Sequence, residues 1–229
     1  VFQPWNKSDA PGLIVGVASK GQAIYRRGFG LASIEHATAN TPHTRMRIGS
    51  PSKHFASLAT LLLAEQGKLD IDAAVRTYLP ELTGVAGDAT LREMMLHTSG
   101  LRDPYDLPSL LLHRGYPHMV SDGAGLELSQ RFTSKNYAPG ERMVYCNNGY
   151  HLLSIVVERI SGESFDAFLK NHILNPLGMV DTELLRSDLQ ITPGIATLHL
   201  PQPDGSYVRG IYPSAELLGS GGMVSTIDD

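Results

Sequence analysis

Apolar residues recur at helical spacing in the stretch that follows residue 50, and this pattern predicts a central helix. The apolar positions are Phe55, Leu58, Ala59, Leu62 and Leu63. A stripe with this spacing is typical of a helix that buries one face. Pro51 suits the first helical position and Ser50 the cap before it, while Gly67 supplies the stop. The pattern therefore predicts a buried helix with Ser50 at its N-terminus.

A β-hairpin is predicted near the N-terminus. The strands are Leu13 to Ala18 and Ala23 to Arg27, joined by the polar turn Ser19 to Gln22. Small and β-branched residues in the first strand favour burial on both faces, as in a sheet covered by helices. Two strands are few for a stable sheet that must bury helices, so more strands are expected.

Four further helices are expected. Thr90 and Glu93 form a capping box that starts a short helix ending at Leu96. The others are Leu126 to Phe132, Tyr150 to Ile160 with Gly162 after its end, and Phe165 to His172. The segments from Arg102 to Gly140 and beyond Met179 are rich in turn residues and are expected to be irregular. The pattern as a whole predicts an α/β fold of the α+β type, an antiparallel sheet flanked by helices with an all-helical subdomain.

Composition limits the function classes. The chain has 229 residues, 42% of them hydrophobic, and a formal net charge of -4. We expect one domain over 1–229, in which 1–48 supplies strands, 49–180 is mainly helical and carries the site, and 181–229 returns toward the sheet. Without a basic patch, nucleic acid is excluded as a partner. No apolar run approaches the roughly 18 residues of a membrane span. Oligomeric state stays open, and a periplasmic or secreted location is favoured over a cytoplasmic one.

Ser50 and Lys53 are the first candidates for chemistry. Residues three apart lie on one face of a helix, so the ammonium of Lys53 can reach the hydroxyl of Ser50. A lysine in a dry site can activate a serine, and a helix N-terminus favours the negative charge that develops. The spacing alone is common on solvated helices. Its position at a predicted helix start, with Pro51 inside, favours the functional interpretation.

Tyr145 and Asn147 precede the predicted helix at Tyr150. Taken singly, Tyr145 could be a core aromatic and Asn147 a helix cap. The two together with the serine and lysine favour a site. Cys146 is expected to be a buried small hydrophobe and His97 to brace its own loop.

Metal and cofactor chemistry is not predicted. Nine histidines occur, but no His-Glu-x-x-His or other ligand spacing is found, so we predict no metal and no cofactor. The absence of a Gly-x-Ser-x-Gly elbow argues against an α/β-hydrolase with a Ser-His-Asp triad.

Three motifs together resemble one known family. They are Ser50-x-x-Lys53 at a helix start, the loop His97 to Leu101, and Tyr145-x-Asn147 before a helix. The chain resembles the serine β-lactamase and penicillin-binding-protein superfamily, in its class C-like branch of D-alanyl-D-alanine carboxypeptidases, D-aminopeptidases and esterases. Ser99 to Asp103 and Tyr145 to Asn147 look closest to the D-aminopeptidase subgroup.

The resemblance implies a role for each site residue. Ser50 would attack a carbonyl and form an acyl-enzyme, with Lys53 assisting its deprotonation. Tyr145 would shuttle the proton between Ser50 and the leaving group, and Asn147 would hold the substrate amide. Which of Lys53 and Tyr145 takes the first proton stays open. The backbone N–H of Ser50 and a second N–H from an edge strand would form the oxyanion hole. A small molecule or short peptide would be the substrate.

The departure from the family pattern concerns a third motif. Such proteins carry Lys-Thr-Gly or His-x-Gly on a late strand, and the chain has neither in a suitable place; Gly219-Ser220-Gly221 lacks the basic residue. We expect further strands after residue 229, preceded by a helix that starts near Asp228, and an inactive chain without them. A serine hydrolase and a non-catalytic relative that binds or senses ligands therefore both stay open.

Overall fold

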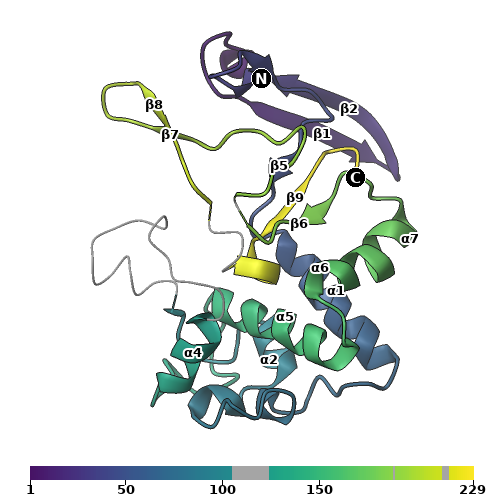
Figure 1. Ribbon diagram of the computed structural model, residues 1–229, viewed down its shortest axis with the longest axis vertical. Coiled ribbons are helices and arrows are strands. Elements are labelled where there is room, and N and C mark those ends of the chain that lie inside the picture. The colour runs from purple at the N-terminus through teal and green to yellow at the C-terminus, as the bar shows by residue number, and fades with distance from the viewer. Residues whose placement is uncertain (105–123, 188, 213–216) are drawn as a thin grey trace.

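The computed structural model describes residues 1–104, 124–187, 189–212 and 217–229. Figure 1 shows the hairpin at one end of the molecule and helices at the other, with a small sheet between them. The α-helices are α1 (Ser52–Glu65), α2 (Leu91–Met95), α4 (Ala124–Arg131), α5 (Asn147–Ser161), α6 (Phe165–Leu169) and α7 (Asn175–Leu177). The short helices are η1 (Gln3–Trp5), η2 (Val75–Thr77), η3 (Val85–Asp88), η6 (Lys170–Leu174) and η7 (Leu218–Ser220).

The strands pair antiparallel, as predicted. They are β1 (Leu13–Ser19), β2 (Gln22–Phe29), β3 (Leu31–Ser33), β4 (Thr38–Ala39), β5 (Met46–Arg47), β6 (Glu183–Leu184), β7 (His199–Pro201), β8 (Tyr207–Arg209) and β9 (Met223–Ser225). Strands β1–β2, β3–β4 and β7–β8 form pairs, and β9 lies between β5 and β6 in a sheet of three. The mixed α/β fold with small antiparallel sheets and helices is confirmed.

The β1–β2 hairpin confirms one prediction and corrects another. Lys20 and Gly21 form its two-residue turn, both with positive φ, which matches the right-handed twist of a hairpin. Burial on both faces was wrong, since most β1 residues and nearly all of β2 are exposed. In the described part of the chain β1 and β2 pair only with each other, so no further strand extends the sheet they form.

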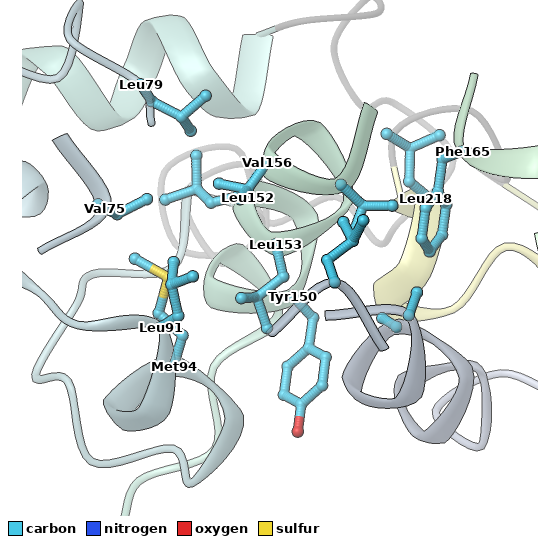
Figure 2. Close-up of a cluster of buried hydrophobic side chains, with 14 of the residues drawn as sticks. Val75, Leu79, Leu91, Met94, Tyr150, Leu152, Leu153, Val156, Phe165 and Leu218 are labelled. Atoms are coloured by element: carbon cyan, nitrogen blue, oxygen red, sulfur yellow. The ribbon is translucent and has the colours of Figure 1, made fainter. Parts of the chain in front are cut away.

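The hydrophobic core lies among the helices, where α1 packs against α5 and α5 against α2 and α6. Figure 2 shows side chains of several elements meeting around α5. Its labelled members are Val75, Leu79, Leu91, Met94, Tyr150, Leu152, Leu153, Val156, Phe165 and Leu218. Within the described residues, no helix has both the length and the apolar character needed to cross a bilayer.

The predicted helices exist, with corrected ends. The capping box of Thr90 and Glu93 is confirmed, and Gly67 and Gly162 follow helices in the left-handed conformation. Helix α5 begins at Asn147 and not at Tyr150, because an aspartate carboxylate accepts its first N–H. The helix predicted from Phe165 to His172 continues as the π-helical turn η6 and then α7.

Helix α1 differs from its prediction at two points. Leu58 is 39% exposed, because the buried face of α1 is formed by Ser52, Lys53, Ala56, Ala59, Thr60 and Leu63. The helix begins at Ser52 with Pro51 as its N-cap, so Ser50 lies one residue before the cap. Tight turns cause this shift, because the N–H of Ser52 donates to Gly49 and that of Lys53 donates to Ser50.

Candidate active site

The turn that carries Ser50 is fixed by its neighbours on α1 and β9. Gly49 has φ +60°, a conformation that glycine adopts without strain. The hydroxyl of Ser52 donates to the carbonyl of Gly49 at 2.7 Å and accepts the N–H of Met223 at 3.2 Å. The carbonyl of Met223 accepts the N–H of Ile48 at 3.0 Å. Strand β9 thus holds the turn before α1, while the Ser50 side chain remains exposed.

Ser50 and Tyr145 are in direct contact. The hydroxyl of Ser50 is hydrogen-bonded to the phenol of Tyr145, although the two residues are 95 positions apart. Tyr145 is 48% exposed, so it is not the core aromatic of the alternative interpretation. The contact leaves both oxygens at the surface of the protein, where a bound molecule could reach them.

Lys53 is buried behind this pair, with 5% of its surface exposed. Its ammonium donates to the side-chain oxygen of Asn147 at 2.8 Å and to the carbonyl of Ser220 at 2.6 Å. The same nitrogen lies 4.6 Å from the centre of the Tyr145 ring and 5.4 Å from that of Tyr150. The ammonium of Lys53 thus donates to Asn147 and Ser220. It was predicted to reach the hydroxyl of Ser50, but that hydroxyl is hydrogen-bonded to Tyr145 instead.

Asn147 lies in the first turn of α5 and links two parts of the site. Its backbone N–H donates to the carboxylate of Asp103 at 2.6 Å, and its side chain accepts from Lys53. Cys146, not Asn147, occupies the cap position of α5. The four predicted site residues, Ser50, Lys53, Tyr145 and Asn147, are therefore brought together by the fold.

Three neighbours of the site were not predicted. Ser220 supplies a carbonyl to Lys53 from the segment just before β9, Asp103 caps α5, and Ser52 braces the turn of Ser50. Ser52 lies within the Ser-x-x-Lys motif itself, so its position there was a signal that could have identified it. Ser220 and Asp103 act over 167 and 44 positions, and sequence periodicity carries no signal for such contacts.

Cys146 and His97 have the places expected for them. Cys146 is buried, and its thiol lies 3.7 Å from the carbonyl of Leu101. His97 accepts the N–H of Cys146 on Nδ1 at 3.1 Å and packs against the ring of Tyr145. Burial, and then the positive charge of Lys53, lower the pKa of His97 below its ordinary value. Burial also raises the pKa of Tyr150, whose phenol donates to the carbonyl of Met95.

The α+β fold places a serine at the start of a helix, a buried lysine one turn later, and a tyrosine in contact with the serine. These features together define a class of protein, and comparison with known proteins agrees with that class. A model of the family described as Beta-lactamase matches residues 1–229. The chain belongs to the Beta-lactamase family.

The relatives include peptidases and penicillin-binding proteins. A D-aminopeptidase of Brucella canis is 29% identical over 223 residues, which are 96% of this chain and 41% of that protein. The octameric penicillin-binding protein homologue from Pyrococcus abyssi has a TM-score of 0.78 at 26% identity, over 93% of this chain and 49% of that one. The penicillin binding protein from Bacillus halodurans has a TM-score of 0.79 at 26% identity, over 94% of this chain and 65% of that one. The chain spans less than half the length of the D-aminopeptidase that it matches.

Proposed function

We propose that this protein is a serine hydrolase that forms an acyl intermediate on Ser50. The observation that carries the proposal is the hydrogen bond between Ser50 and Tyr145, with the ammonium of Lys53 over the tyrosine ring. Nucleophile and proton acceptor are in contact, and a fixed positive charge lies beside the acceptor.

The reaction would proceed in two halves. Tyr145 would react as the phenolate, with the ammonium of Lys53 over its ring. The oxygen of Ser50 attacks a carbonyl carbon, and the proton of Ser50 passes to the phenolate oxygen, which becomes a neutral phenol. Tyr145 then protonates the departing amine or alcohol, leaving the acyl group on Ser50. In the second half water attacks the ester and gives a proton to the Tyr145 phenolate, and Tyr145 passes this proton to the oxygen of Ser50 as the acid leaves. The N–H of Ser50 would donate to the developing oxyanion.

The substrate we propose is a peptide or amide with a D-configured residue at the cleaved bond. Support comes from the name of the Brucella relative and from the motifs Ser99 to Asp103 and Tyr145 to Asn147. Asn147 would contact the substrate amide through its side-chain nitrogen, because its oxygen already accepts from Lys53. A carboxypeptidase or β-lactamase activity uses the same intermediate. An exported location, periplasmic or secreted, suits such substrates.

Active-site labelling tests the intermediate. The full-length protein is incubated with a fluorescent penicillin and a fluorophosphonate, and mass spectrometry locates the label. We expect label on Ser50, since Ser52, Ser99 and Ser220 are 0%, 1% and 1% exposed. Ser50→Ala should stay folded and unlabelled. Label on a buried serine would contradict the mechanism, and folded wild-type protein without label would favour a non-catalytic binding relative.

Substrate comparison tests the finer proposal. D- and L-alanine p-nitroanilides are assayed beside short p-nitrophenyl esters, with Ser50→Ala as the blank. We expect faster release from the D-anilide. Preference for the L-anilide, or action on esters alone, would move the protein to the esterases of the same fold.

A further inference from the structure

Tyr145 lies in a segment without regular secondary structure. Residues 142–146 form neither helix nor strand, and the side chains of Met143, Val144 and Tyr145 are all exposed. Neither a strand ladder nor a helix therefore fixes the phenol that touches Ser50. Another group must hold this segment, because a displacement of about 1 Å in an active site can lower a rate about a hundredfold.

His97 makes hydrogen bonds on both sides of Tyr145. Its carbonyl accepts the N–H of Val144 at 3.0 Å, and its Nδ1 accepts the N–H of Cys146 at 3.1 Å. The imidazole also packs against the Tyr145 ring, with ring centres 4.6 Å apart and planes inclined by 31°. Backbone and ring of one histidine thus hold the tyrosine in place.

His97 is itself held firmly. It has φ +58°, a conformation that is uncommon outside glycine, although asparagine, aspartate and histidine are enriched in it. Its N–H donates to Met94 at 3.2 Å, its carbonyl also accepts from the phenol of Tyr137 at 3.2 Å, and only 9% of its surface is exposed. The contacts that His97 makes with Val144, Tyr145 and Cys146, here called the clamp, are therefore anchored at the C-terminal end of α2.

Nδ1 can accept the N–H of Cys146 only without a proton of its own. In the neutral ring the proton is then on Nε2. If Nδ1 were protonated, its N–H and the N–H of Cys146 would both be donors, and the hydrogen bond between them would break. Among the described residues, the charged and titratable groups that face His97 are the ammonium of Lys53, the phenols of Tyr145 and Tyr150, the thiol of Cys146 and, at the His97 carbonyl, the phenol of Tyr137.

We propose that His97 is a positioning residue that holds Tyr145 against Ser50, and that its protonation releases this clamp and switches the site off in acid. The inference rests on the proposed acylation of Ser50. The contacts of His97 in the described structure reach Tyr145 and its two neighbours and not Ser50, so its effect passes through Tyr145. The acid limb of the reaction would then report the titration of His97.

The sign of the pH effect follows from burial. Burial and Lys53 lower the pKa of His97 in the folded protein, whereas in the unfolded chain the pKa is about 6.5. The unfolded chain therefore binds the proton more readily. The stabilisation by neutral His97 is complete above about pH 6.5 and is lost as the pH falls through the lower, folded value.

Two substitutions distinguish a role of His97 as the clamp from a role in packing alone. Asparagine tolerates positive φ, and its side-chain oxygen can take the place of Nδ1, but it does not titrate. In the full-length protein, His97→Asn should label with the fluorophosphonate at a rate near that of the wild type at pH 8, and should keep that rate as the pH is lowered through the range in which the wild type slows. His97→Gly keeps the backbone conformation but lacks the acceptor, and labelling of Ser50 should slow by about ten- to a hundredfold.

An NMR measurement decides the clamp independently of activity. In the ¹⁵N-labelled wild-type protein, His97 should be the Nε2–H tautomer at pH 8, and the Cys146 amide signal should shift as His97 titrates. A Nδ1–H tautomer, or His97→Gly labelling as fast as the wild type, would overturn the inference. Failure of the wild type to label would instead reject the proposed function, and the NMR result would still decide the clamp.

Discussion

The candidate site has two sides that differ in burial. Ser50 and Tyr145, the exposed side, lie on a turn and an irregular segment and are hydrogen-bonded to each other. Lys53 and Ser220, the buried side, are joined by the ammonium of Lys53, which also binds the partly buried Asn147. Three positions of the sequence separate Ser50 from Lys53, yet one faces solvent and the other the core.

This difference in burial indicates that the two sides of the site can have different chemical roles. The exposed oxygens can exchange their mutual hydrogen bond for contacts with a reacting molecule. The buried ammonium keeps its partners inside the protein, so its charge is fixed before anything binds. Preorganised charge of this kind stabilises a transition state without rearrangement during the reaction. The exposed side would supply the reacting atoms and the buried side a constant field.

The strongest test of the comparison removes one oxygen from the exposed side. In the full-length protein, Tyr145→Phe should lower turnover by about two to four decades, the usual span for a lost general acid or base, with little change in the melting temperature. Turnover and thermal unfolding are measured on the same preparation. Near wild-type turnover in the Phe variant would assign Tyr145 to packing alone and would break the comparison.

The second test addresses the helices beneath the buried side. Leu153→Ala in α5 should lower the free energy of unfolding by about 2–5 kcal/mol, since Leu153 is fully buried in the core. Leu58→Ala on the exposed part of α1 is the matched control and should change stability by less than about 1 kcal/mol. Urea unfolding of the two variants measures the difference. Equal losses would show that burial does not separate these positions.

A third test tightens the space around Ser220. A Cβ at Gly219 would lie 2.5 Å from the hydroxyl of Ser154 and 2.8 Å from the Cβ of Ala56, between α5 and α1. Gly219→Ala should therefore cost about 1–3 kcal/mol and reduce turnover, because the carbonyl of Ser220 shifts away from Lys53. In Gly16→Ala, the control in β1, the new Cβ meets only Ile227 at 3.4 Å. A stable and fully active Gly219→Ala protein would contradict the tight packing described.

The smallest effect is expected at an ion pair far from the core. Arg26 in β2 lies 2.5 Å from Asp228, with side chains 50% and 21% exposed. Solvent screens such pairs, so Arg26→Ala should lower stability by less than about 1 kcal/mol, and less still in high salt. Thermal unfolding at low and high salt measures it. A larger loss would mean that the hairpin depends on this contact.

Local patterns predicted much of the fold and of the site. The capping box of Thr90, the glycine after α5 and the two-residue hairpin turn depend on neighbours within a few positions, and each is confirmed. Ser50, Lys53, Tyr145 and Asn147 were recognised because short motifs carry them. Their chemical roles stay predictions.

Contacts between distant segments could not be predicted. Helical spacing shows that α1 has an apolar face, but which residues are covered depends on where α5 and the segment before β9 pack, and so Leu58 is exposed. Alternation in β1 likewise says nothing about whether another layer covers it. The carbonyl of Ser220 has no side-chain signature at all, although it binds Lys53.

The bond from Lys53 to Ser220 joins residues 167 positions apart, and this separation has a consequence for biosynthesis. A ribosome makes α1 and α5 well before residue 220. Closing so long a loop costs conformational entropy, and this cost slows the formation of the contact. Until that segment docks, the ammonium of Lys53 faces water. The nascent chain thus carries an incomplete site until residue 220 has been made, and the lysine enters its final environment only when that segment docks.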